Sequence, residues 1–283
     1  MSQNHIKPCI PFPTLLIEEG TETILVVADL HIGWEVSLVE KGIHLPSQMS
    51  RLQTKLLEII MEYKPTHIIF LGDIKQMIPK ISYEEWKNVP EFFKTIQKSV
   101  EKISVTLGNH DGDLKPLVPS TVNIFSSGGM VVGDKGRIGL FHGHAWPSKK
   151  VLQCEVLIMG HIHPILLFKD QIGLWTMRQI WVTTQCDSRK LARAYLKYLK
   201  IKSFDKPEVT LNEKLGIELR EPKLVIMPAF NDLVGGVSIN KMNRGLMGPL
   251  LGSGSVLINE ADLYLLDGTL IGSVKQIREH LGE

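Results

Sequence analysis

The sequence is poor in cysteine, with three among 283 residues. Cys9, Cys154 and Cys186 form no CxxC pair, and an odd number of thiols cannot pair completely. These features argue against a disulfide framework and against a cysteine-rich structural zinc site. We therefore expect reduced thiols in a cytoplasmic protein.

Long apolar runs are also lacking. None approaches the ~18–20 residues needed to span a bilayer, and residues 1–13 do not combine a basic segment with an apolar one. We expect no membrane partner and no signal peptide.

A strong charge of either sign is missing as well, because 32 Lys and Arg nearly balance 30 Asp and Glu to a net charge of +2. This balance does not demand a nucleic-acid partner, although a local basic groove can exist within a balanced total. Hydrophobic residues make up 43% of the chain, enough to bury a substantial core. The sequence contains no internal repeat, and we expect residues 1–283 to form one domain.

Five short β-branched runs each lead into a polar, glycine-containing segment. They cover residues 23–28, 66–71, 103–107, 137–141 and 155–159. Amphipathic helical patterns at 47–63 and 84–102 separate the first three runs, which predicts mostly parallel strands with right-handed crossovers. Residues 130–132 and 137–141 flank the glycines at 133 and 136, which predicts a hairpin.

The C-terminal part gives weaker patterns. We expect strands at 179–184, 223–227 and 261–266, the last turning at Asp267-Gly268, and an amphipathic helix at 188–201. The charged residues 203–221 are expected to form an exposed connection. Composition and periodicity alone predict an α/β fold with a mixed sheet.

Residue types that bind metals follow each of the five runs. They are Asp29, His31, Asp73, Asn109, His110, His142, His144, His161 and His163. Each one alone is an ordinary turn or surface residue. Their recurrence at the same end of successive strands favours a shared site, because ligands of open α/β sheets bind at the carboxyl edge.

Hydrolysis of a phosphate ester would explain this mixture of donors. Two cations about 3.5–4 Å apart clamp a phosphate and lower the pKa of a bridging water. A carboxylate can bridge two ions, whereas an imidazole normally binds one. Mixed Asp, Asn and His ligands suit Mn, Fe, Zn or Co better than Mg or Ca, which prefer oxygen ligands throughout.

The same segments form an ordered set of motifs. They are Asp29-x-His31, Gly72-Asp73, Gly108-Asn109-His110-Asp111, His142-Gly143-His144 and Gly160-His161-x-His163. Over residues 24–164 this set resembles the five motifs of calcineurin-like metallophosphoesterases. Residues 29–35, 228–231 and 265–268 further resemble a prokaryotic branch of phosphoesterases related to the ICC and SbcD-like proteins.

The resemblance implies a four-layer α/β/β/α sandwich with mixed sheets, in which residues 175–283 complete the second sheet and add a small C-terminal cap. It also implies a metal-dependent hydrolase of phosphate mono- or diesters with two divalent ions. We expect Mn²⁺, with Fe, Zn, Co or Ni as alternatives. The substrate would be a small molecule or a nucleotide, and the oligomeric state is not indicated.

The resemblance assigns a role to each motif residue. The first ion would be bound by Asp29, His31 and His163. The second would be bound by Asn109, His142 and His161. Asp73 would bridge the two ions. His110, oriented by Asp111, would protonate the leaving group or stabilise the transition state.

Three residues near the motifs leave alternatives open. His144 is a ligand in place of His142, a hydrogen-bond donor behind the ligands, or a substrate contact; we favour His142 as the ligand because it directly ends the apolar run. Gln76 stands where the second motif usually has Asp, Asn or His, which is expected to weaken the orientation of the site. Lys75 is either a phosphate contact or a solvated side chain.

Two other functions compete with a small-molecule phosphoesterase. The first is an SbcD-like nuclease acting on DNA or RNA, against which the near-neutral charge and the lack of a basic tract count. Salt-sensitive DNA binding would support it. The second is a non-catalytic metal-binding scaffold, against which the complete ligand set and His110 argue.

Overall fold

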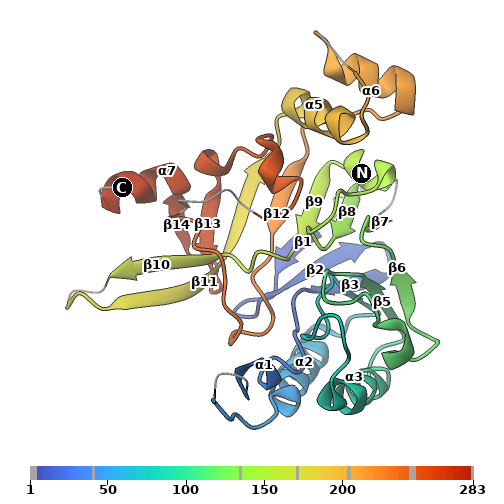
Figure 1. Cartoon of the computed structure of the whole chain (residues 1–283), viewed down its shortest axis with the longest axis vertical. Helices are drawn as coiled ribbons and strands as arrows, with labels where there is room; N and C mark the ends of the chain where they lie inside the picture. The colour runs from blue at the N-terminus through green and yellow to red at the C-terminus, as the bar shows by residue number, and fades with distance from the viewer. Residues whose placement is uncertain are drawn as a thin grey trace.

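The computed structural model describes residues 5–39, 42–133, 136–169, 172–202, 205–241 and 247–281. Two β-sheets lie face to face, and helices cover the outer face of each (Figure 1). The predicted four-layer α/β/β/α sandwich is thereby confirmed.

The first sheet has six strands in the order β1-β2-β3-β4-β5-β6. Their bounds are His5–Pro8, Thr14–Glu19, Glu22–Val27, His67–Phe70, Lys102–Thr106 and Asn123–Phe125. Strands β3 to β6 are parallel, as the βαβαβ pattern predicted, whereas β1 and β2 add an antiparallel edge that the sequence patterns did not indicate.

The helices on this sheet are α2 (Met49–Tyr63) and α3 (Tyr83–Ile96), with the short α1 (Val36–Val39) and a 3-10 turn at Lys115–Leu117 nearby. The helix expected over 84–102 ends at Ile96, and Lys102 already begins β5. The start of α3 is well defined because Ser82 and Glu85 form a reciprocal capping box.

The second sheet follows the order β14-β13-β11-β12-β9-β8-β7, and β10 pairs with β11 beside this path. The bounds of β7 to β10 are Met130–Val132, Ile138–Phe141, Val156–Met159 and Ile165–Lys169. Those of β11 to β14 are Trp175–Gln185, Lys223–Ile226, Asp262–Leu265 and Leu270–Ser273. The predicted hairpin is confirmed because β7 and β8 pair antiparallel; its residues 134 and 135 lie outside the described part.

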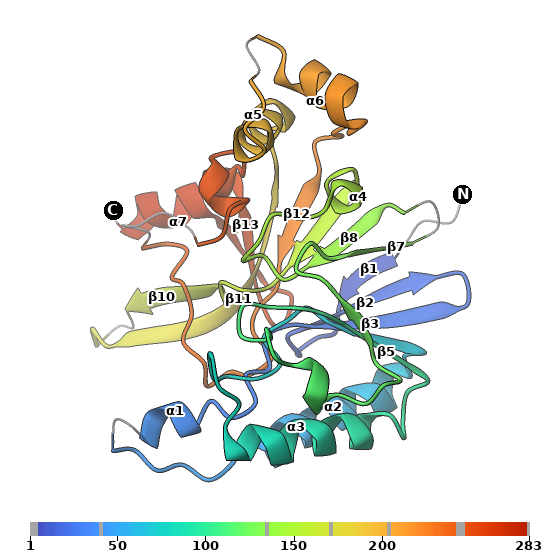
Figure 2. The ribbon, with the colours of Figure 1, turned by 45° about the vertical axis from the view of Figure 1, so that its right-hand side comes forward.

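The outer layer of the second sheet contains α4 (Lys149–Leu152), α5 (Ser188–Tyr198), α6 (Pro207–Leu215) and α7 (Val274–Leu281), as Figure 2 shows. Short 3-10 turns lie at Leu251–Ser253 and Ile258–Glu260. The expected connection over 203–221 is wrong in part, because α6 lies within it. Its signals were Pro207 in the first turn and the left-handed Gly216 after the last.

Three layers of buried side chains hold the sandwich together. The layer between the sheets includes Ile24 and Val26 of β3, Leu140 of β8, Ile158 of β9 and Trp181 of β11. One further core lies under α2 and α3, and the other lies under α4 and α5. Within the described residues, no helix has both the length and the apolar character needed to cross a membrane.

We expect Phe93→Ala to lower the free energy of unfolding by about 3–5 kcal/mol, because large-to-small changes in a core leave a cavity. Phe93 is fully buried, and its ring packs edge-on against Phe70 and Phe92, with centroids 5.7 Å away in each case. The control is Trp86→Ala in the same helix, a residue that is 51% exposed, which should change stability by only about 0.5 kcal/mol. Denaturant titration of both variants measures the difference, and equal losses would contradict this account of the core.

Candidate metal centre

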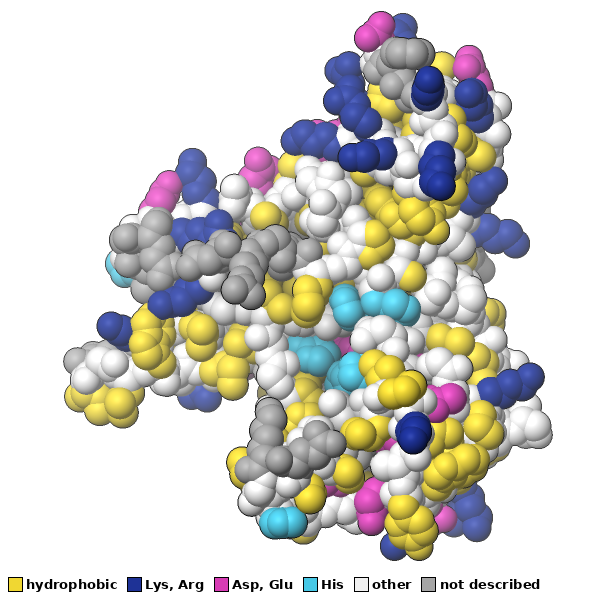
Figure 3. All heavy atoms as spheres, in the orientation of Figure 1, with side chains coloured by type: hydrophobic (Ala, Val, Ile, Leu, Met, Phe, Trp, Pro, Cys, Tyr) yellow, Lys and Arg dark blue, Asp and Glu magenta, His cyan; other side chains and the backbone are white. Residues whose placement is uncertain are grey.

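The predicted motif residues lie at the carboxyl ends of parallel strands from both sheets. In the first sheet, Asp29 follows β3, Asp73 follows β4 and Asn109 follows β5. In the second sheet, His142 follows β8 and His161 follows β9. The histidines gather on one face of the molecule, with acidic side chains behind them (Figure 3). The fold therefore brings all five motifs to one place.

The backbone at this place is held in an unusual conformation. Among the residues that the structure describes, eight non-glycine residues have a positive φ, and five of them are predicted ligands: Asp29 (59°), His31 (47°), Asp73 (51°), His161 (76°) and His163 (45°). Left-handed backbone costs an L-residue about 1–2 kcal/mol. Such strain concentrates at functional sites, where the surrounding structure enforces it.

Main-chain hydrogen bonds enforce this conformation across the strand ends. The amide of Asp29 donates to the carbonyl of Gly72 at 3.2 Å, and the amide of His31 donates to the carbonyl of Asp73 at 2.8 Å. The His161 amide donates to the carboxylate of Asp29 at 3.1 Å. These bonds fix the turns of different motifs relative to one another.

The first group of donors comprises Asp29, His31 and His163, whose ligand atoms lie within 4.8 Å of one another. The Nε2 atoms of His31 and His163 are 3.2 Å apart, and His163 Nε2 lies 3.3 Å from Asp29 Oδ1. His163 Nδ1 donates to the carbonyl of Gly235 at 2.8 Å. In the neutral ring this bond leaves the Nε2 lone pair directed at the group.

The second group comprises Asp73, His142 and His161. His142 Nε2 lies 3.3 Å from Asp73 Oδ2 and 3.1 Å from His161 Nδ1. Asn109 Oδ1 is 3.2 Å from the same His142 nitrogen. His142 Nδ1 donates to the carbonyl of Leu71 at 2.7 Å, so the other ring nitrogen faces the group.

The carboxylate of Asp73 belongs to both sides of the centre. Besides its contact with His142, Asp73 Oδ2 lies 3.6 Å from His31 Nε2. Asp73, His31 and His110 form a third group that overlaps with the other two. The carboxylate of Asp73 thus lies next to donors of both sides, and its role as a bridge between two ions stays a prediction.

Burial and the neighbouring charges set the protonation of these donors. Burial lowers the pKa of His31 and of His161 to about 4, so both rings are neutral at pH 7. Burial would raise the pKa of Asp73, but His142 and His31 outweigh it and hold that pKa below its usual range. Burial likewise opposes the charged form of His142, yet the Asp73 carboxylate raises its pKa to about 9. Ionised carboxylates and neutral imidazoles are the donor forms that bind divalent cations, so a cation bound here would have to displace the proton of His142.

His110 lies at the edge of the centre and is oriented by the main chain. Its Nδ1 donates to the carbonyl of Gln76, and its Nε2 lies 3.9 Å from Asp73 Oδ2. The side chain is 21% exposed, so it borders the open side of the centre. The amide of Gln76 donates to the buried Glu85 carboxylate at 2.9 Å, which holds this loop in place. Gln76 thus contacts His110 through its main-chain carbonyl.

Asp111 has different partners from those expected. Its carboxylate accepts hydrogen bonds from the amides of Gly108 and Ile74, both at 2.9 Å. Burial raises the pKa of Asp111 to about 6, and the nearby Asp73 adds to this effect. Asp111 ties the second motif to the third, while the carbonyl of Gln76 supplies the orienting contact to His110.

The positions of Lys75 and His144 in the structure decide between the alternatives that the sequence left open for these two residues. Lys75 is neither solvated nor open to a phosphate, because its side chain is 1% exposed and pairs with Asp113 at 2.8 Å. His144 lies beside the second group, with its ring centroid 5.2 Å from that of His142, and its buried Nδ1 has no hydrogen-bond partner. His142, rather than His144, sits within the donor group.

The sequence did not indicate a role for Asn231. In the structure this residue holds the first motif in place by hydrogen bonds to its main chain. Its side-chain amide donates to the carbonyl of Leu30 at 3.1 Å, and its main-chain amide donates to that of Asp29 at 3.3 Å. Arg51 donates to the Asn231 side chain at 3.1 Å. The signal was the segment 228–231, noted only for its resemblance to a branch of the family.

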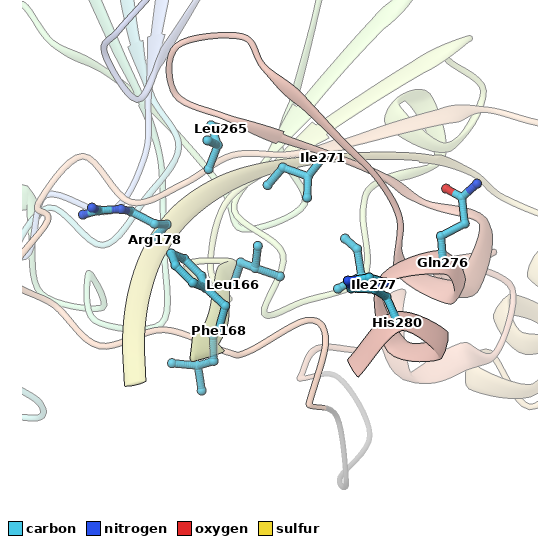
Figure 4. Close-up of a pocket in the computed structure, with 9 residues that line it drawn as sticks. Leu166, Phe168, Arg178, Leu265, Ile271, Gln276, Ile277 and His280 are labelled. Atoms are coloured by element: carbon cyan, nitrogen blue, oxygen red, sulfur yellow. The ribbon is translucent and has the colours of Figure 1, made fainter. Parts of the chain in front are cut away.

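A separate apolar hollow of about 710 Å³ lies between the β10–β11 ribbon, β13–β14 and α7 (Figure 4). Its lining includes Leu166, Phe168, Leu265, Ile271 and Ile277. None of the predicted site residues lines it. We therefore do not assign it to the metal centre.

We expect Gly108→Ala to weaken Mn²⁺ binding about 10–100-fold, the range typical of changes behind metal ligands. A Cβ at position 108 would strike the carboxylate and the amide of Asp73. The control is Gly112→Ala, because a Cβ there meets nothing within 4 Å. Calorimetric Mn²⁺ titrations of both variants test this. Unchanged binding by Gly108→Ala would mean that the glycine does not make room for Asp73.

A family model and one solved structure agree with the fold. The family model for calcineurin-like phosphoesterases matches residues 22–170. The crystal structure of Pseudomonas putida nuclease MPE is 17% identical, covers 93% of this chain and 98% of its own, and has a TM-score of 0.50. The E. coli phosphoesterase Yfce is 15% identical, covers 88% of this chain and 96% of its own, and has a TM-score of 0.39. No curated protein matches the sequence significantly. Because the family model spans more than half of the chain, this protein belongs to the calcineurin-like phosphoesterase family.

Proposed function

We propose that this chain hydrolyses a phosphate mono- or diester at a centre of two divalent metal ions, with Mn²⁺ giving the highest activity, and that residues 1–283 form one catalytic domain. The observation that carries the proposal is the position of Asp73 between two groups of imidazole and carboxylate donors. One buried carboxylate shared by two groups is the arrangement that two neighbouring cations require.

The donors present fit such ions. The nitrogens of His31 and His163 face each other at 3.2 Å, as do those of His142 and His161 at 3.1 Å. Facing lone pairs repel each other unless a proton or a cation lies between them. In our proposal Asp29, His31 and His163 hold one ion, Asn109, His142 and His161 hold the other, and Asp73 bridges them. The mixed nitrogen and oxygen donors favour Mn²⁺ over Mg²⁺ or Ca²⁺.

When bound, the two ions would neutralise the phosphate and supply a hydroxide nucleophile. His110 would act on the leaving-group oxygen of the ester. Because Nδ1 donates to the carbonyl of Gln76, Nε2 is the atom that meets the ester oxygen and gives it a proton. Asp73 accepts from the amide of His110 at 3.0 Å, which couples the position of this ring to the centre. A scaffold without catalysis would not need such a group.

A nuclease acting on DNA or RNA is the second candidate. The neighbour from P. putida is a nuclease by name, but its likeness at 17% identity supports the fold alone. In this chain the observation that favours a nucleic acid is the row of exposed Arg and Lys side chains on α5.

The proposal is tested by a screen of phosphate mono- and diesters with the metal-free protein and added Mn²⁺, Mg²⁺ or Zn²⁺. We expect two ions per chain and the fastest turnover with Mn²⁺. Ions that bind only the folded state also raise stability, by about 2.7 kcal/mol at 100 times the dissociation constant. A single closed, four-coordinate ion per chain would contradict the two-metal centre.

We expect Asp73→Asn to abolish binding at both metal positions and Asp29→Asn to impair mainly one. The reason is that Asp73 contacts both donor groups, whereas Asp29 belongs to only one of the three groups. Metal content after reconstitution and dialysis measures the difference, with the exposed Asp262→Asn as the control. Equal losses in the two ligand variants would show that the bridge is wrongly assigned.

We expect His110→Ala to keep its metal content and to lose about 10²–10⁴-fold in turnover, the contribution of a positioned acid. The loss should be largest for alkyl esters and smaller for p-nitrophenyl esters, whose leaving group needs little protonation. The exposed His44→Ala is the control. Full activity of His110→Ala on an alkyl ester would refute the role, and a loss of metal would make His110 a structural residue.

A further inference from the structure

Helix α5 presents a row of positive charge to the solvent. Arg189, Arg193 and Lys197 are spaced four residues apart, and Lys200 follows three residues later; all four are exposed. Arg189, Arg193 and Lys197 therefore lie on one face of α5, with Cβ atoms about 5–6 Å apart, whereas Lys200 lies just after the helix, which ends at Tyr198. The opposite face of α5 is buried in the core that lies under α4 and α5. The row is therefore fixed on the protein surface by packing beneath it.

This charge is mostly uncompensated. From residue 188 to residue 202 the sequence contains no Asp or Glu. Within the described part of the chain, no carboxylate lies within ion-pair distance of Arg193, Lys197 or Lys200. By contrast, Arg137 and Arg220 elsewhere on the second sheet share the carboxylate of Glu155, at 3.6 and 3.3 Å. The net charge of +2 thus conceals a local basic surface.

The basic side chains also surround a hollow. Arg193, Lys197, Lys200 and Lys202 line a recess of about 300 Å³ together with two apolar residues of the same segment. Like charges gathered in this way repel one another, so the arrangement favours a bound anion. Several positive charges along a helix fit several anionic groups along a chain better than a single small anion.

An aromatic cluster connects this surface to the metal centre. Trp146 lies two residues after His144, and its ring packs against Tyr195 and Tyr198 of α5 with centroids 5.4 and 5.7 Å away. Tyr198 is 57% exposed next to the basic row. Figure 3 shows Lys and Arg side chains over α5 and α6 on the same face as the histidines of the centre.

We propose that the exposed face of α5 and the segment that follows it, formed by Arg189, Arg193, Lys197, Lys200 and Lys202 with Tyr198, bind a single nucleic-acid strand. The cations contact successive phosphates, and the exposed ring of Tyr198 stacks on a base, the combination by which proteins hold single strands. That the bound nucleic acid is also the substrate rests on the proposed function. That α5 binds nucleic acid does not depend on it. An anionic membrane fits less well, because a membrane-bound helix needs a free apolar face and that of α5 is buried.

The test compares two triple variants of the Mn²⁺-loaded full chain. Arg193→Gln, Lys197→Gln and Lys200→Gln neutralise the α5 surface, while Lys87→Gln, Lys94→Gln and Lys98→Gln neutralise three exposed lysines at α3. Both variants lose the same total charge. The probe is a labelled phosphorothioate oligothymidylate of about 20 nucleotides, which resists hydrolysis, and binding is followed by fluorescence anisotropy over a series of salt concentrations.

We expect the α5 variant to bind the oligonucleotide at least about tenfold more weakly than the wild type. The slope of log K against log salt concentration should become smaller in magnitude by about 2–3. The α3 variant should keep the wild-type affinity and slope. Tyr198→Ala should lower the affinity for the oligonucleotide about tenfold and should change the salt slope little. Equal losses in the two triple variants, or no loss in the α5 variant, would overturn the inference. Tighter binding to phosphatidylserine vesicles than to the oligonucleotide, abolished by the α5 variant, would also overturn it in favour of a membrane.

Hydrolysis of bis-p-nitrophenyl phosphate separates this inference from the proposed function. The α5 variant should retain the wild-type rate on this small ester, because none of its altered residues belongs to the metal centre. An inactive wild-type protein that binds the oligonucleotide through α5 would refute only the phosphoesterase. An active protein without α5-dependent binding would refute only the nucleic-acid surface.

Discussion

The buried carboxylate of Asp73 is the contact on which the rest of the centre depends. It lies 3.3 Å from a nitrogen of His142 and 3.6 Å from one of His31, and it accepts the amide hydrogen of His110. These three residues come from three different motifs. A charged group in such a place is costly unless opposite charge or hydrogen bonds surround it. The donors around Asp73 are therefore also what allows it to remain ionised.

The surrounding structure compensates for a strained centre. Left-handed backbone at five ligand positions and carboxylates sealed from water would both favour a rearranged chain. Rigid elements oppose this rearrangement: the parallel strands that end at the centre, the Asp111 carboxylate between two motif loops, and Asn231 beneath the first motif. Glycines at 72, 108 and 160 leave the space that the ligands occupy. Bound cations would add attraction where imidazole nitrogens of different motifs lie only 3.1–3.2 Å apart.

The two proposals assign chemistry and recognition to separate parts of the molecule. The centre is built from side chains at the ends of strands, which fix distances to within a narrow range. The proposed nucleic-acid surface lies on a helix of the outer layer and connects to the centre through Trp146. Such a division would let recognition change without altering the metal centre, because changes in an outer helix leave the strand ends intact.

The sequence by itself determined the βαβαβ order, the motif residues and the donor chemistry, because buried parallel strands and metal ligands require particular residue types at short range. It did not determine how Asp111 and Gln76 act, since their hydrogen-bond partners are set by loops that meet only after folding. Lys75 looked like an exposed lysine because Asp113 pairs with it only in the folded loop. The α6 helix was hidden by its charged, weakly patterned sequence. The basic surface was hidden in a balanced total charge, and only packing of the apolar face of α5 decided that its arginines and lysines would point outward together.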